Sequence, residues 1–145
     1  MNTFLFLDVS VWLALAHEVH PHHRAAVAWG ESVDPSSRFY FCRFSQLSLL
    51  RLLTNASTMG DDVATQAEAW RIYDLFHANG KTFLADEPKG IEEMLRLRTS
   101  KDEVSTKEWA DVYLTAFAEL AGLRFVTFDK ALARKTKGAI LLSGR

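Results

Sequence analysis

The chain has 145 residues, of which 48% are hydrophobic and 12% aromatic, so residues 1–145 can bury a sizeable core as one domain. The net charge of −1 excludes a globally basic surface, so any contact with nucleic acid has to rest on local patches and a metal ion. The single cysteine, Cys42, excludes an internal disulfide and suits a reducing cytoplasm. No stretch approaches the roughly 18 consecutive apolar residues of a membrane span, so we expect a soluble, cytoplasmic protein without membrane contact.

Short apolar runs alternate along the chain with longer helical patterns. The runs of strand length and composition are TFLFL (3–7), FYFC (39–42), TFLA (82–85), RFVTF (124–128) and AILL (139–142). The helical patterns cover 10–17, 22–33, 45–54, 61–78, 90–98 and 107–121. This alternation predicts an α/β fold in which a central, mostly parallel sheet of four to five strands is flanked by helices on both sides.

Two acids directly follow predicted strands. Asp8 comes after the run 3–7, and Asp129 comes after the run 124–128. In open α/β sheets the ligand site lies outside the carboxyl ends of the strands, so we expect both carboxylates to point into one crevice. An unpaired charge withdrawn from water costs several kcal/mol, so an acid in the apolar stretch around Asp8 needs a partner or a chemical role.

A third acid lies in the helical pattern 107–121. The apolar positions there follow the spacing of a buried face and comprise Trp109, Val112, Tyr113, Ala116, Phe117 and Leu120. Asp111 lies about 200° from Trp109 around this helix, at the border of the apolar stripe and near the N-terminus, where a negative charge is favoured. Glu108 stands three residues after Ser105, a spacing typical of a capping box, so we assign it a structural role.

Carboxylates that converge in this way repel one another. At about 5 Å and an effective dielectric constant of about 20, the cost is about 3 kcal/mol per pair, which a fold keeps only for a reason. Hard oxygen ligands suit Mg²⁺ or Mn²⁺, and such an ion can polarise a phosphodiester and activate an attacking water. Asp8, Asp111 and Asp129 are therefore candidate catalytic residues for metal-dependent phosphate chemistry.

A family resemblance is carried by FLDVSVWLALAHEVHPHHRAAVAW, SLLRLLTN and WADVYLTAFAELAGLRFVTFDKAL, in that order. Together these stretches resemble the PIN-domain ribonucleases, and in detail the VapC toxins of bacterial toxin–antitoxin pairs. The resemblance implies a PIN-like three-layer fold, a Mg²⁺-dependent endoribonuclease that cleaves RNA, a homodimer, and neutralisation by a small cognate antitoxin. It matches Asp8, Asp111 and Asp129 to three acids of the family.

The sequence departs from the family at the remaining acid. The family usually has a Glu three residues before the arginine of SLLRLLTN, where this chain has Ser48. Gln46 is near, but it is neutral, and Ser48 offers only a hydroxyl. The resemblance therefore implies one metal ion held by Asp8 and Asp111, with Asp129 bound directly or through water.

Three further features have a functional and a structural interpretation. The run HEVHPHH (17–23) lacks the spacing of a zinc site, so we interpret it as a turn that starts the next helix. Ser10 stands two residues after Asp8, where its hydroxyl can steady the carboxylate or cap the helix. A cluster of bases forms either a positive rim for RNA phosphates or an ordinary solvated turn; it comprises Lys130, Arg134, Lys135 and Lys137.

Two alternative functions stay open at this stage. The absent Glu allows a non-catalytic or weakened PIN-like protein that binds RNA or its antitoxin without cutting. An Asp-based α/β phosphatase fits less well, because its D-x-D motif needs an acid where this chain has Ser10.

Apolar residues in two predicted helices exceed what one buried face requires. They lie in 10–17 and 45–54 and comprise Trp12, Leu13, Leu49, Leu50 and Leu53. We therefore expect some of them to meet a helix of an antitoxin or of a second subunit.

Overall fold

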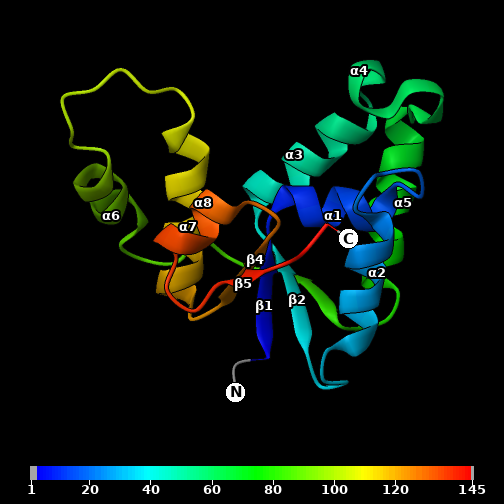
Figure 1. The fold of residues 1–145 in the computed structure, drawn as a ribbon, viewed down its shortest axis with the longest axis horizontal. Helices are drawn as coiled ribbons and strands as arrows, with labels where there is room; N and C mark the ends of the chain where they lie inside the picture. Colours follow the sequence, from blue (N-terminus) through cyan, green and yellow to red (C-terminus); the bar gives the residue numbers. More distant parts are fainter. Residues whose placement is uncertain (1–2, 145) are drawn as a thin grey trace.

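The computed structural model describes residues 3–144, which contain a five-stranded sheet (Figure 1). The strands are β1 (Phe4–Leu7), β2 (Arg38–Phe41), β3 (Thr82–Leu84), β4 (Arg124–Thr127) and β5 (Ile140–Leu141). They lie in the order β3-β2-β1-β4-β5, and every neighbouring pair is parallel. All five strands coincide with predicted apolar runs, and the predicted α/β class is confirmed.

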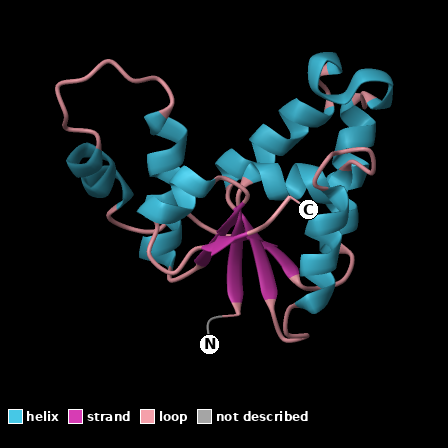
Figure 2. Ribbon diagram, viewed as in Figure 1, coloured by secondary structure: helices cyan, strands magenta, loops and turns pink. Residues whose placement is uncertain are grey.

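Helices cover both faces of this sheet (Figure 2). Their bounds are α1 (Val9–Ala16), α2 (His23–Ser32), α3 (Arg43–Leu53), α4 (Ala56–Met59), α5 (Gln66–His77), α6 (Ile91–Arg98), α7 (Glu108–Ala121) and α8 (Lys130–Lys135). The helices α1, α3 and α5 supply the apolar cluster on one face, and α6, α7 and α8 supply the cluster on the other. None of the helices within residues 3–144 is long and apolar enough to cross a membrane.

The central strand β1 serves both faces. Phe6 belongs to one apolar cluster and stacks on Phe117 of α7 with ring centroids 5.0 Å apart, whereas Leu5 and Leu7 belong to the other. Because side chains alternate along a strand, a strand covered on both faces needs apolar residues at every position. The run therefore continues to Leu7, and Asp8 is the first residue beyond the covered part of the strand.

Two helix predictions differ from the structure. The predicted helix 61–78 is divided into a 3₁₀ turn, η1 (Gly60–Asp62), and α5, which begins where the Thr65 hydroxyl accepts a hydrogen bond from the N–H of Glu68 at 3.1 Å. This cap satisfies a free N–H of the first turn and sets the start of α5. The short helices α4 and α8 were not predicted.

The start of α7 also differs from the prediction. Lys107 takes the N-cap position without a side-chain hydrogen bond, so the predicted capping box of Ser105 and Glu108 is wrong. Ser105 lies two residues before the N-cap, outside the position from which its hydroxyl could cap the helix. Trp109, predicted on the buried face, is 61% exposed because α7 is buried only from Leu114 onward.

The apolar residues expected to meet a partner lie mostly in the core. Four of the five are buried, namely Trp12, Leu13, Leu49 and Leu53, so the expectation is wrong for them. The ring of Trp12 stacks on Phe41 of β2 with centroids 3.8 Å apart. The helices α1 and α3 pack on the sheet and on each other, so each needs a wider apolar surface than one face provides.

Candidate active site

The Asp8 carboxylate lies at the carboxyl end of β1, in the middle of the sheet. Asp8 occupies the N-cap position of α1, but its side chain forms no capping hydrogen bond. The hydroxyl of Thr127, which is 0% exposed, instead donates a hydrogen bond to Asp8 Oδ2 at 2.7 Å. Ser10 donates to the same oxygen at 3.4 Å, a weak bond at that length, in keeping with the supporting role considered for it.

Thr127 links two of the predicted acids. Its hydroxyl oxygen accepts a hydrogen bond from the backbone N–H of Asp129 at 3.0 Å while its proton goes to Asp8. Asp129 caps α8, because its Oδ1 accepts a hydrogen bond from the N–H of Leu132 at 3.1 Å. Sequence reasoning missed Thr127, although a hydroxyl inside the apolar run RFVTF was a signal that could have found it.

Asp111 lies half-buried in the first turn of α7, as the helical pattern predicted. Burial raises the pKa of Asp8 above its ordinary value, repulsion from Asp111 raises it further, and the hydrogen bond from Thr127 opposes both effects. Burial also raises the pKa of Asp111, and repulsion from Asp129 adds to this. Charge repulsion thus acts between Asp111 and Asp8 and between Asp111 and Asp129.

The acidic site offers carboxylate oxygens of the kind that suit a divalent metal ion. Within residues 3–144, no group of three or more His, Cys, Asp or Glu side chains is close enough together to hold one ion. Mg²⁺ commonly uses only one or two carboxylates and fills its other positions with water and substrate phosphate oxygens. Asp8 and Asp111 together offer two carboxylates, which are hard oxygen donors and fit this way of binding Mg²⁺. One carboxylate oxygen of Asp129 is already engaged in the helix cap of α8.

The helix α3 carries Ser48 on the side that faces α7. Phe44 lies one turn before Ser48 on the same face, and its ring contacts Tyr113 of α7 with centroids 5.7 Å apart. Gln46 is buried on another face, where its Oε1 accepts a hydrogen bond from Arg43 at 2.6 Å. Neither Ser48 nor Gln46 therefore replaces the missing carboxylate.

A further acid at this edge of the sheet was not predicted. Glu87 lies in the loop after β3, and its Oε1 accepts a hydrogen bond from the Tyr113 hydroxyl at 2.8 Å. Burial and the Glu87 carboxylate raise the pKa of Tyr113, so the phenol stays protonated and acts as the donor. This hydrogen bond therefore connects the loop after β3 to α7.

The four predicted bases are all exposed. Lys130, Arg134 and Lys135 belong to α8, and Lys137 follows it. The Lys135 ammonium acts on Asp111 and lowers its pKa, against the larger effect of burial. At least this lysine is therefore near the acidic site, which favours the positive rim over an unrelated surface turn.

The histidine run forms the turn that the sequence predicted. His22 is the N-cap residue of α2, and the helix begins at His23. His17 pairs with Asp62 at 3.0 Å, and His23 Nδ1 contacts the carbonyl oxygen of Ala14 at 2.7 Å. These contacts fasten the turn to α1 and η1.

Comparison with known proteins assigns the family. The PIN domain family profile matches residues 5–138. The chain belongs to the PIN domain family. Among curated relatives of this PIN-domain protein, ribonuclease VapC41 of Mycobacterium tuberculosis is 40% identical over 134 residues, which cover 90% of this chain and 92% of the relative.

Solved structures show the same PIN fold at low sequence identity. VapC20 of Mycobacterium tuberculosis, described as a sarcin–ricin loop cleaving toxin, superposes with a TM-score of 0.66 at 14% identity, covering 90% of this chain and 94% of VapC20. VapBC2 of Rickettsia felis, bound to a DNA fragment from its promoter, gives a TM-score of 0.62 at 10% identity, covering 96% and 98% of the two chains. The predicted PIN-like three-layer fold is therefore confirmed.

Proposed function

We propose that this PIN-domain protein is a Mg²⁺-dependent endoribonuclease and the toxin of a toxin–antitoxin pair. The relative VapC41 is a ribonuclease and shares 40% of its residues with this chain over most of both lengths. The observation that carries the proposal is the buried-edge pair of Asp8, held by Thr127, and Asp111 on the facing helix. Because the substrate is RNA inside a cell, the proposed location is the cytoplasm.

In this proposal Asp8 and Asp111 hold the metal ion. Mg²⁺, or Mn²⁺ in its place, supplies the positive charge that polarises the phosphodiester and lowers the pKa of the attacking water. Thr127 fixes the Asp8 carboxylate in one orientation, and Ser10 assists it. Asp129 keeps α8 in place through its cap and adds negative charge beside Asp111.

The proposed partners are a small antitoxin and a second copy of the chain. Apolar side chains remain exposed on two neighbouring helices, Leu47 at 55% on α3 and Leu75 at 73% on α5. A surface groove between these helices is lined by Leu50, Arg51 and Trp70, among others. Exposed apolar area of this kind supports binding of a protein partner. It is a better candidate for the contact surface than the residues suggested by the sequence, most of which are buried.

A second candidate function is favoured by Ser48. With a hydroxyl where the family usually has an acid, the protein can bind RNA or its antitoxin while cleaving weakly or not at all. The Asp-based phosphatase fits poorly, because Ser10 takes the place of the second acid of that class and contacts Asp8 only as a hydrogen-bond donor.

The test is cleavage of single-stranded or looped RNA with Mg²⁺ or Mn²⁺. We expect the purified protein to cut, EDTA to stop it, and Asp8→Asn to lower the rate by roughly a hundredfold or more, since even supporting residues of metal sites cost 10–100-fold. Asp61→Asn, a matched change at an exposed position, is expected to keep full activity. Identical fragments from wild type and Asp8→Asn would contradict the catalytic proposal and leave the binding function.

A further inference from the structure

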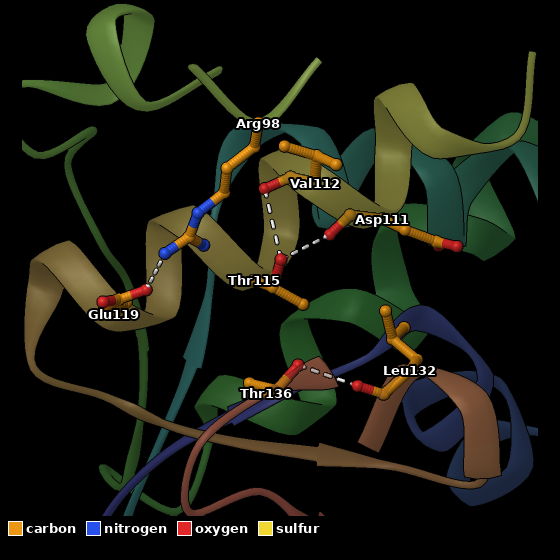
Figure 3. A network of polar contacts seen from close by, with 7 residues as sticks. All are labelled: Arg98, Asp111, Val112, Thr115, Glu119, Leu132 and Thr136. Carbon is orange, nitrogen blue, oxygen red and sulfur yellow. Dashed lines mark hydrogen bonds and ion pairs between the residues drawn. The ribbon is translucent and has the colours of Figure 1, made fainter. Parts of the chain in front are cut away.

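A pocket of about 150 Å³ lies beside the acidic site, between α6, α7 and α8 (Figure 3). Thr115 lines it and donates a hydrogen bond to the carbonyl oxygen of Asp111 at 2.9 Å, so the pocket begins one helical turn from the acid. Lys135 lines the opposite wall and acts electrostatically on Asp111. In Figure 3 the Asp111 carboxylate points away from this pocket, so the two sites are adjacent and separate.

The pocket offers hydrogen-bond acceptors. Thr115 and Thr136 give their hydroxyl protons to backbone carbonyl oxygens, those of Asp111 and Leu132, so both hydroxyl oxygens can only accept further bonds. Glu119 adds a carboxylate, which forms an ion pair with Arg98 (Figure 3). A ligand that fits here must therefore carry N–H or O–H donors.

The pocket also offers donors and an apolar wall. Arg98, Lys135 and Lys137 supply cationic N–H groups, and neither lysine forms an ion pair within the part of the chain that is described. Ala118 and Leu123 supply apolar surface. With three cations and one carboxylate, the lining carries a net positive charge and attracts a polyanion.

This combination discriminates between ligands. A phosphodiester has only acceptors, so it could contact the three cations but would leave Glu119 and the two threonine oxygens without donors. A nucleobase carries donors and acceptors on the edge of an apolar ring, and it is followed by a phosphate. A volume of about 150 Å³ corresponds to about five water molecules, which admits one base and excludes a base pair.

We propose that this pocket is a subsite for one nucleotide of the RNA strand, next to the phosphodiester at the acidic site. The base enters between Thr115 and Thr136 and is read by Glu119 and Arg98, while its phosphate meets Lys135 and Lys137. The inference rests on the proposed RNA substrate and deepens it. Reading unstacked bases by their edges is how proteins recognise single-stranded RNA in a sequence-specific way, so the subsite determines base preference.

The first experiment maps cleavage sites in a pool of RNA with all four bases at each position. We expect Glu119→Gln to change the preference for the base at one position beside the cut by about tenfold, because the carboxylate becomes an amide with both donors and an acceptor. The readout is the distribution of cuts among the four bases, which is compared within each protein and does not depend on its total rate. Glu31→Gln, an identical change on an exposed turn of α2, is expected to alter nothing. An unchanged preference in Glu119→Gln would overturn the proposal.

The second experiment needs no cleavage. In EDTA, each of the four nucleoside monophosphates and inorganic phosphate is titrated into the labelled protein, and the amide signals of Thr115 and Thr136 are followed by NMR. We expect at least one nucleotide to saturate the chemical-shift changes at about a tenth of the concentration that inorganic phosphate needs. We expect Glu119→Gln to change the order of affinity of the four nucleotides. Equal responses to phosphate and to all nucleotides would overturn the base subsite. If wild type cuts no RNA, the proposed function fails, and this titration still decides the pocket.

Discussion

The two sides of the candidate site hold their carboxylates differently. On the sheet side, Asp8 receives a 2.7 Å hydrogen bond from the buried Thr127, whose own oxygen is occupied by the N–H of Asp129. On the helix side, the Asp111 carboxylate forms no hydrogen bond within residues 3–144 and meets its neighbours only through charge. Its position depends on the first turn of α7, which lacks a side-chain cap.

This difference indicates which of the two carboxylates, Asp8 or Asp111, is held in place and which can move. A half-buried carboxylate with a buried hydroxyl donor behind it has one orientation, and any change of length misplaces its free oxygen. A half-buried carboxylate on an uncapped helix turn can move with that turn. We infer that Asp8 fixes where the proposed metal ion sits and that Asp111 adjusts to it.

The largest expected effect comes from lengthening each acid by one methylene. Asp8→Glu is expected to lower RNA cleavage by roughly a hundredfold, because the longer side chain cannot keep the Thr127 hydrogen bond and the metal position together. Asp111→Glu is expected to cost less than about tenfold, since its surroundings leave room to adjust. Single-turnover rates with saturating Mg²⁺ measure both. Equal losses in the two variants would remove the distinction between a fixed and an adjustable side.

The next effect concerns the hydroxyl that fixes Asp8. Thr127→Val keeps the shape but leaves the Asp8 carboxylate and the Asp129 N–H without their partner, so we expect a loss of roughly 10–100-fold in activity and about 1–3 kcal/mol in unfolding free energy. Thr127→Ser restores the hydroxyl and is expected to recover most of the activity. A Val variant as active as wild type would mean that the hydroxyl only stabilises the fold.

The smallest expected effect is on the pH dependence of the unfolding free energy in the absence of metal ions. The pKa values of Asp8 and Asp111 are raised from the ordinary 3.8, so the folded protein keeps protons that the unfolded chain has released. The stability that these two groups contribute is complete below pH 3.8 and is lost as the pH rises through their raised pKa values. In EDTA we therefore expect the midpoint of urea unfolding to fall over this range, and to fall less in Asp8→Asn.

Metal ions are expected to reverse this loss. At pH 7, Mg²⁺ or Mn²⁺ at a hundredfold excess over the dissociation constant should stabilise wild type by about 2.7 kcal/mol and Asp8→Asn much less. Without metal, Asp8→Asn is expected to melt at a higher temperature than wild type, because a repelling charge is removed. A variant that melts lower in EDTA, with no metal shift in either protein, would show that Asp8 serves the fold alone.

The strands of the sheet could be predicted from the sequence because they are covered by helices on both faces. Such strands must be apolar at every position, so each one stands out as a short run. The helix α8 did not stand out, because KALARK is six residues long and follows a strand whose end signals a turn. The packing of Trp12 and Leu49 was misjudged, because a periodic pattern shows one face of a helix and these helices contact both the sheet and each other.

For the site, the sequence indicated the acids and missed their support. Asp8 and Asp129 follow from the rule that ligands bind at the carboxyl ends of parallel strands, and Asp111 follows from its place on the helix. Thr127 shows in the sequence only as a hydroxyl within an apolar run, and its role depends on a contact across the sheet. Glu87 was missed for the same reason, since its partner Tyr113 lies on a distant helix.

The bond between Asp8 and Thr127 joins residues 119 positions apart, and this separation governs when the site can exist. Chains are synthesised from the N-terminus at about 5–20 residues per second, so the first strand leaves the ribosome several seconds before β4 follows. During that interval Asp8 has neither its hydroxyl donor nor the neighbouring carboxylates of Asp111 and Asp129. For the proposed ribonuclease, the acidic site therefore stays incomplete until β4 has been translated and has left the ribosome.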